Sequence, residues 1–214
     1  MALCSLASIF ILIPFFLFGI ASGHDVEFHI ASWLDAASQW KQGILYPRWT
    51  QWTNHGFGEP RFIFYPPLSW MLGAALTLVL PGTAVPMVYI VLTQTLAGLS
   101  AYFLLRRLAT RRAAILGALF YCVNPDALLM VYIRSDFAEQ LACALFPLLL
   151  LSALYVSELP ETPRPRAHHI ATFALLYAGA WLSNAPAGVI ASYAMALLLG
   201  WAAVTRRRWP ILLG

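Results

Sequence analysis

The sequence predicts an all-α membrane protein, a bundle of helices that cross the bilayer several times. Hydrophobic residues make up 61% of the 214 residues, charged residues only 10%, and the mean hydropathy is +0.73. A soluble domain carries about 25% charged residues and could not cover this much apolar surface. The apolar residues also fall in runs that approach the roughly 20 residues an α-helix needs to cross a bilayer.

Six of these runs are predicted to span the membrane. They are residues 2–21, 87–105, 110–123, 139–156, 170–183 and 187–204. The first run has no basic residues before it and is longer than the apolar core of a signal peptide, so we expect it to be retained. Another apolar run starts at Trp209 and stops at Gly214. We therefore expect residues 1–214 to form one transmembrane domain, the N-terminal part of a longer protein.

Residues 22–86 form a polar first loop that contains one further apolar stretch, residues 68–80. Pro66 and Pro67 prevent a regular helix from continuing through the segment, and the stretch is short for a span, which favours an interfacial or re-entrant helix. Counting basic residues instead mildly favours a crossing, because that would place the loop's own cations on the cytoplasmic side with the arginine clusters at 106–112, 164–166 and 206–208. The residues alone leave both topologies open.

Two acids stand where the first span leaves the bilayer, and they are candidate catalytic residues. Asp25 and Glu27 follow a run without charge, and His29 lies four residues after Asp25. Ionisable groups near the membrane are costly and often mark function, here a general base with His29 orienting it. The alternative is that these are interfacial side chains satisfied by water. The sequence leaves open whether a divalent cation takes part.

Cations and acids further along could bind a phosphorylated substrate. The arginines expected on the outer side are Arg48, Arg61 and Arg134. Arginine offers forked donors that suit a phosphate, although contact with lipid headgroups or pairing with Glu59 or Asp136 would explain them as well. Asp136 and Glu139 could bind substrate or cap a helix. No cysteine–histidine spacing predicts a metal site, and no basic-aromatic strip predicts nucleic-acid binding.

Several short motifs follow one another in the first loop. They are Asp25 with His29, Gly43 with Pro47-Arg48-Trp49, Gly56 and Gly58 with Pro60, and Phe64-Tyr65-Pro66-Pro67-Leu68. In this order they resemble the N-terminal part of bacterial multispanning membrane proteins called 6-pyruvoyl-tetrahydropterin synthase-related. A later element with Tyr132, Arg134 and Glu139 extends the resemblance. The soluble synthase itself is a zinc enzyme of another fold, and this chain lacks its histidine cluster.

The layout is also similar, more distantly, to that of GT-C glycosyltransferases, which use polyprenyl-phosphate sugars. That resemblance implies a cytoplasmic N-terminus, an extracytoplasmic loop 22–86 with juxtamembrane helices, and a location in the bacterial cytoplasmic membrane among its lipids. It implies catalysis by Asp25 and Glu27. The residues expected to bind the substrate are His29, Arg48, Arg61, Tyr65, Arg134, Asp136 and Glu139. Here the first acids form Asp-Val-Glu, whereas many such enzymes carry an adjacent pair.

The alternative function is that of a transporter or flippase-like protein, which moves a molecule across the membrane and catalyses no reaction. Transporters place ionisable groups near the bilayer midplane and show broken helices in repeated halves. This sequence places its acids at the predicted outer ends of helices and shows no internal repeat. The pattern therefore favours a transferase that acts on a lipid-linked sugar.

Overall fold

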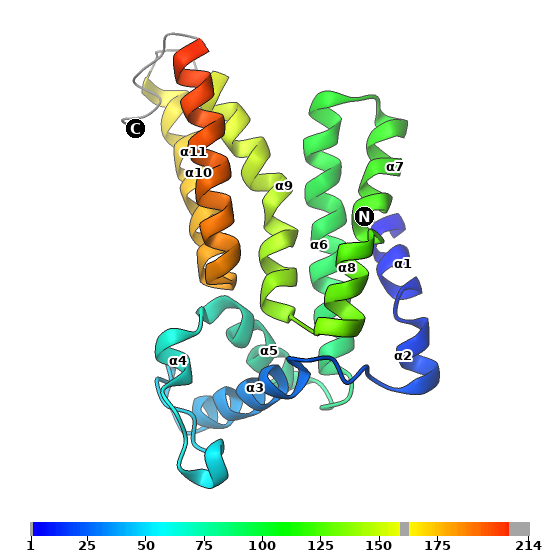
Figure 1. Ribbon diagram of the computed structural model, residues 1–214, viewed down its shortest axis with the longest axis vertical. Helices are drawn as coiled ribbons and strands as arrows, with labels where there is room; N and C mark the ends of the chain where they lie inside the picture. The colour runs from blue at the N-terminus through cyan, green and yellow to red at the C-terminus, as the bar shows by residue number, and fades with distance from the viewer. Residues whose placement is uncertain (1, 159–162, 206–214) are drawn as a thin grey trace.

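The computed structural model describes residues 2–158 and 163–205, with side chains over 2–158 and 167–205, and it is built of helices (Figure 1). No β-strand occurs in these ranges, and a single isolated bridge pairs Thr50 with Glu59. The all-helical class predicted from the sequence is thus confirmed. The arginine cluster at 206–208 and the apolar run at 209–214 lie outside the described residues.

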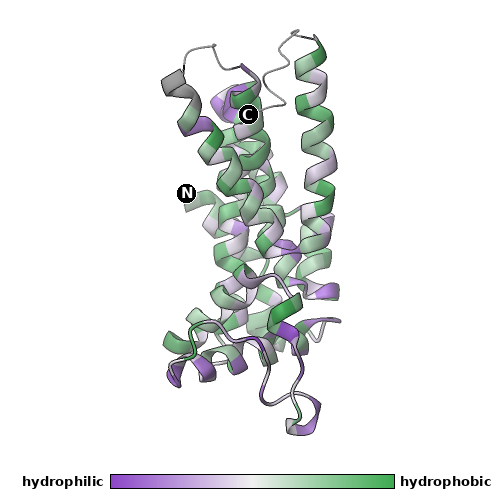
Figure 2. Cartoon of the chain, turned by 90° about the vertical axis from the view of Figure 1, so that its left-hand side faces the viewer, coloured by the Kyte–Doolittle hydropathy of each residue, from purple (hydrophilic) through white to green (hydrophobic). Residues whose placement is uncertain are grey.

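Four helical segments of the described part are long and apolar enough to cross a membrane. They are α6 (Val85–Leu108), the segment Arg111–Arg134, α9 (Phe137–Glu158) and α11 (Ala185–Thr205). The second of them consists of α7 (Arg111–Cys122), α8 (Pro125–Leu129) and the π-helical turn η2 (Met130–Arg134). The helix α10 (Pro163–Ser183) packs against α9 and α11. Figure 2 shows mostly hydrophobic residues along the upright helices, with hydrophilic residues in the loop region at one end and also near the opposite ends of the helices.

The N-terminal apolar run forms two short helices instead of the single helix expected over residues 2–21. These are α1 (Ala2–Phe10) and α2 (Ile13–Phe18). Pro14 explains the break, because its ring lacks an N–H and clashes with the carbonyl four residues earlier, at Phe10. The helix α1 packs against α6 and α7.

The long loop after α2 carries a small helical layer of its own. It contains α3 (Val26–Lys41), the 3-10 turn η1 (Asn54–Gly56), α4 (Arg61–Phe64) and α5 (Pro67–Val79). The layer lies at the end of the bundle opposite the α6–α7 turn (Figure 1). At 13 residues, α5 is about 20 Å long, well short of the roughly 30 Å of a bilayer core.

An aromatic cluster attaches this layer to the bundle. The indole of Trp33 in α3 stacks on the ring of Tyr89 in α6, with centroids 5.1 Å apart, and lies 5.0 Å from the ring of Phe137 in α9. On α5, a Cβ at Gly73 would stand 2.3 Å from the Trp33 indole, so only glycine permits this approach. The Tyr89 hydroxyl donates to the Phe137 carbonyl over 3.1 Å. These contacts hold the middle of α3 against the starts of α6 and α9.

The position of this layer gives a test of topology. If residues 22–86 are extracytoplasmic, single cysteines at Gln51 and Ala109 in a background free of the three native cysteines should be labelled from opposite sides of the membrane. The loop position should react in intact cells and the α6–α7 turn only after permeabilisation. Labelling of both from the same side would contradict the expected topology.

Candidate functional site

The start of α3 docks against the end of the η2 turn through backbone hydrogen bonds. The amides of His24 and Asp25 donate to the carbonyls of Ile133 and Arg134, over 3.1 and 2.9 Å. Gly23 makes the approach possible, since a Cβ there would meet the Ser135 hydroxyl at 2.1 Å. This docking places Asp25, the N-cap residue of α3, next to the segment that leads into α9.

Arg134 holds two acids at the beginning of α9. Its guanidinium lies 3.0 Å from Asp136 Oδ2 and 2.5 Å from Glu139 Oε2. The other oxygen of Asp136 accepts a hydrogen bond from the Glu139 amide over 2.9 Å, so Asp136 also caps α9. The expectation that Asp136 caps a helix and the expectation that it pairs with arginine are both met in this cluster.

The two aspartates, Asp25 and Asp136, line one cleft of about 390 Å³ at this end of the bundle. Its opposite wall is the junction between α10 and α11, where Asn184 accepts a hydrogen bond from the Ala187 amide over 2.9 Å. The cleft is lined by Asp25, Phe28, Phe64, Tyr65, Pro66, Asp136, Asn184, Ala185 and Pro186. Residues from four distant parts of the sequence therefore meet around two carboxylates.

Tyr65 lines the cleft together with both aspartates. Burial, and then the negative charges of Asp136 and Asp25, raise the pKa of Tyr65 above its ordinary value of 10.0. The phenol is protonated at neutral pH, as an ordinary tyrosine is, and the raised pKa keeps it so further into the alkaline range. It can donate a hydrogen bond to an oxygen of a bound molecule.

His29 is almost fully buried behind the cleft and is neutral at physiological pH. Its pKa is lowered from 6.5 to about 4, mainly because burial disfavours the charged ring, and the charge of Arg61 acts in the same direction while Asp25 opposes it. The Nε2 atom lies 3.8 Å from Asp136 Oδ1 and has no hydrogen-bond partner among the described residues. Because the ring is neutral, this contact is not an ion pair at pH 7. The side chain thus approaches Asp136, and no hydrogen bond joins it to the Asp25 carboxylate in the described structure.

The low pKa of His29 predicts a loss of stability in acid. Between pH 6.5 and 4 the unfolded chain binds a proton that the buried ring does not, so the free energy of unfolding falls as the pH falls through this window. A His29→Gln variant lacks this contribution. We expect the unfolding temperature of the wild type to drop more steeply from pH 7 to pH 4.5 than that of the variant, measured in the same detergent. Parallel profiles would contradict the assignment.

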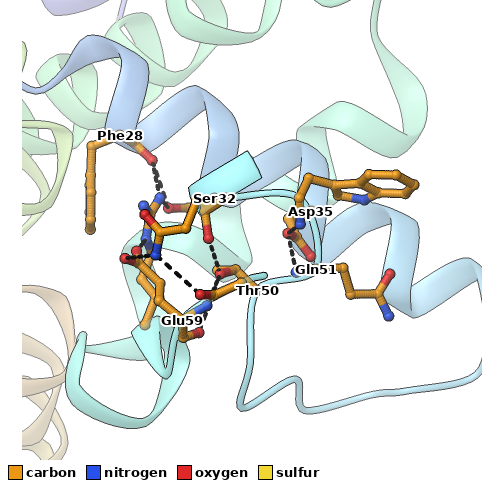
Figure 3. A network of polar contacts seen from close by, with 11 residues as sticks. Phe28, Ser32, Asp35, Thr50, Gln51 and Glu59 are labelled. Atoms are coloured by element: carbon orange, nitrogen blue, oxygen red, sulfur yellow. Dashed lines mark hydrogen bonds and ion pairs between the residues drawn. The ribbon is translucent and has the colours of Figure 1, made fainter. Parts of the chain in front are cut away.

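Arg61 lies beneath the cleft and stabilises α3. Its guanidinium donates to the Phe28 carbonyl over 3.1 Å and to the Ser32 hydroxyl over 2.9 Å, and it lies 4.0 Å from the centre of the Phe28 ring. Glu59 accepts from the Nε of Arg61 over 2.5 Å. Figure 3 shows Phe28, Ser32 and Glu59 gathered in this network. Arg61 therefore pairs with Glu59 and other protein groups. Pairing of this kind was the alternative to phosphate binding that the sequence left open.

Two of the candidate residues lie away from the cleft. The side chains of Glu27 and Arg48 are exposed, and neither lines the cleft. Of the candidates, Asp25, Tyr65 and Asp136 line it directly. His29, Arg61, Arg134 and Glu139 do not line it, but each contacts Phe28 or Asp136, which do. No group of three or more His, Cys, Asp or Glu side chains suited to a metal ion occurs in the described part of the chain.

Asp35 is a structural residue that the sequence analysis did not identify. The residue is 1% exposed. Its carboxylate accepts from the amides of Gln51 and Trp52, over 2.6 and 3.1 Å, and from the Gln39 side chain over 2.7 Å. Figure 3 shows Asp35 beside Gln51. The sequence offers little signal for this role, because Ser32 and Gln39, one turn away on α3, are polar as well. The structure buries all three, and a buried carboxylate needs hydrogen-bond partners.

The fold and the cleft define a helical membrane protein with an ionisable site where its long apolar helices end. A sequence-family model described as the 6-pyruvoyl-tetrahydropterin synthase related domain, a membrane protein, matches residues 62–210. The chain belongs to this family, as the motif resemblance predicted. The match begins at Phe62, so most of the motifs of the first loop lie before it. Neither the curated proteins nor the solved structures that were searched give a match.

Proposed function

We propose that this membrane protein transfers a sugar from a polyprenyl-phosphate donor at the cleft, on the extracytoplasmic side of a bacterial cytoplasmic membrane. The observation that carries the proposal is the cleft itself, where Asp25 and Asp136 face one cavity together with the protonated Tyr65 hydroxyl. The layout supports it, because α3 and α5 form a layer at the ends of apolar helices, as the juxtamembrane helices of GT-C enzymes do.

Asp25 is the better placed of the two aspartates to act as a base. Both carboxylate oxygens of Asp136 accept hydrogen bonds, one from Arg134 and one from the Glu139 amide. The carboxylate of Asp25, by contrast, makes no capping hydrogen bond at the start of α3. In the proposed step, Asp25 takes the proton of an acceptor hydroxyl while that oxygen forms a bond to the anomeric carbon of the donor. The bond from that carbon to the phosphate oxygen breaks, and polyprenyl phosphate leaves with its electron pair.

Arg134 and Tyr65 suit the leaving phosphate. Arg134 keeps 38% of its side chain exposed despite its two ion pairs, so the protein does not enclose it fully. Arginine binds phosphate through forked donors, and a neutral phenol adds one more hydrogen bond. The lipid tail of such a donor would lie along the apolar helices, with the sugar at the cleft.

The test is an assay of the full-length protein in proteoliposomes with a panel of polyprenyl-phosphate sugars. We expect release of polyprenyl phosphate together with a glycosylated product. Movement of the intact lipid-linked sugar across the bilayer without its cleavage would refute the proposal and favour the flippase alternative. Matched liposomes without protein give the background for both readouts.

A further inference from the structure

A groove of about 310 Å³ lies between the start of α1, α6 and α7, at the other end of the bundle from the cleft. It shares no lining residue with the cleft. Most of its lining is apolar, for example Leu99 of α6 and both Ile115 and Leu119 of α7. Arg111, the first residue of α7, is the one charged side chain among the residues that line it.

The charge and the apolar lining are ordered by depth. Arg111 stands where α7 begins, at the end of the bundle, and Ile115 and Leu119 follow it by four and eight residues. At 1.5 Å per residue they lie about 6 and 12 Å further into the bilayer. Leu99 stands nine residues before Leu108, where α6 ends, so it is about 14 Å from the same end. The groove thus runs inward from a cation at the membrane surface.

The described part of α1 closes the groove only at its inner end. A Cβ at Gly98 of α6 would stand 2.8 Å from the Cys4 sulfur, so the start of α1 packs at the depth of Gly98. Gly98 lies ten residues before the end of α6 at Leu108. Figure 1 shows the beginning of α1 well below the α6–α7 turn. Between that level and the turn, α6 and α7 are left uncovered by α1.

No contact within the described residues explains the charge of Arg111. Arg107, in the last turn of α6, pairs with Glu158 and lies 5.1 Å from the centre of the Tyr155 ring. The Arg111 side chain is exposed and makes no ion pair or hydrogen bond with another described residue. It also stands in the first turn of a helix, where the helix dipole disfavours a cation. An anion at this position would stabilise it.

We propose that this groove binds an anionic phospholipid, with its phosphate on Arg111 and one acyl chain along the apolar lining. A phospholipid carries its phosphate at the membrane surface and its chain below, which is the order of Arg111, Ile115 and Leu119 in the groove. The positive-inside rule assigns this arginine-rich end to the cytoplasmic side, where lipid headgroups carry net negative charge. A zwitterionic lipid brings its own cation beside the phosphate, so the unpaired charge of Arg111 favours the anionic class.

Native mass spectrometry of the detergent-purified full-length protein tests the headgroup contact, with dioleoyl phosphatidylglycerol as the probe. Arg111→Gln should weaken binding about 5-fold, the effect of one basic residue beside an anionic headgroup. Arg106→Gln is the matched control, because it removes the same charge from the same turn and Arg106 does not line the groove. We expect it to bind within about 2-fold of the wild type, since long-range attraction alone is weak. Dioleoyl phosphatidylcholine, with the same chains and no net charge, should bind the wild type more weakly.

A second pair of variants tests the acyl chain. Ile115→Trp fills the groove and should weaken binding about 4-fold for each buried methylene group that the indole displaces. Leu116→Trp adds the same ring at the neighbouring position, which is exposed and does not line the groove, and should bind as the wild type does.

Three outcomes would overturn the proposal. Equal losses in Arg111→Gln and Arg106→Gln would mean that the arginines attract anionic lipid without a defined site. Equal binding by Ile115→Trp and Leu116→Trp would mean that no chain occupies the groove. Equal affinity of the wild type for the phosphatidylglycerol and the phosphatidylcholine would exclude recognition of the charge. The lipid comparison needs no variant, so the test holds even if a substitution prevents folding.

Discussion

Replacing Asp25 with asparagine is expected to lower turnover by about 10²–10⁴-fold, the range that a positioned general base contributes. Asparagine keeps the size of the side chain but cannot take a proton from an acceptor hydroxyl. Asp25 makes no side-chain capping bond, so the substitution should leave folding and membrane insertion unchanged. The measurement is initial-rate sugar transfer in membranes that carry the full-length protein, normalised to the amount of inserted protein.

Glu27→Gln is the matched control, because it removes an acid two residues away whose side chain is exposed and does not line the cleft. We expect it to keep turnover within a few-fold of the wild type. Near-normal activity of Asp25→Asn would exclude Asp25 as the base. Equal losses in both variants would indicate a shared site, in which neither acid alone is the base.

The helices were largely predictable, because an apolar run of about 20 residues has the length that a helix needs to cross the hydrocarbon core. The all-helical class and the family rest on such local signals, the second on short motifs with fixed spacing. The break between α1 and α2 was not foreseen, although Pro14 was visible in the sequence. A proline inside an apolar run can kink a helix or end it, and tertiary packing against α6 and α7 decides between the two.

The site was harder to predict than the helices because it depends on contacts between distant residues. Asp25 was identified from its place after an uncharged run. That it faces Asp136 follows from the docking of α3 on η2, which the sequence does not encode locally. Arg61 and Arg134 have the same side chain, yet one is enclosed by α3 and the other remains open beside the cleft. Spacing along the chain could not separate these two roles.

Asp35→Ala is expected to destabilise the protein by about 3 kcal/mol, since it leaves buried donors without their acceptor. The carboxylate joins α3 to the loop by accepting from the amides of Gln51 and Trp52. The same loop leads to Arg61, which donates a hydrogen bond to the carbonyl of Phe28 on the cleft wall. Hydrogen exchange should rise over residues 42–60 before the apolar helices are affected, and the unfolding temperature should fall. Glu27→Ala removes an exposed acid from the same helix and should change stability by less than about 1 kcal/mol. If the two alanine variants unfold at the same temperature and exchange alike in the loop, then Asp35 does not hold the loop, and the rigidity of the cleft wall must come from the aromatic cluster around Trp33.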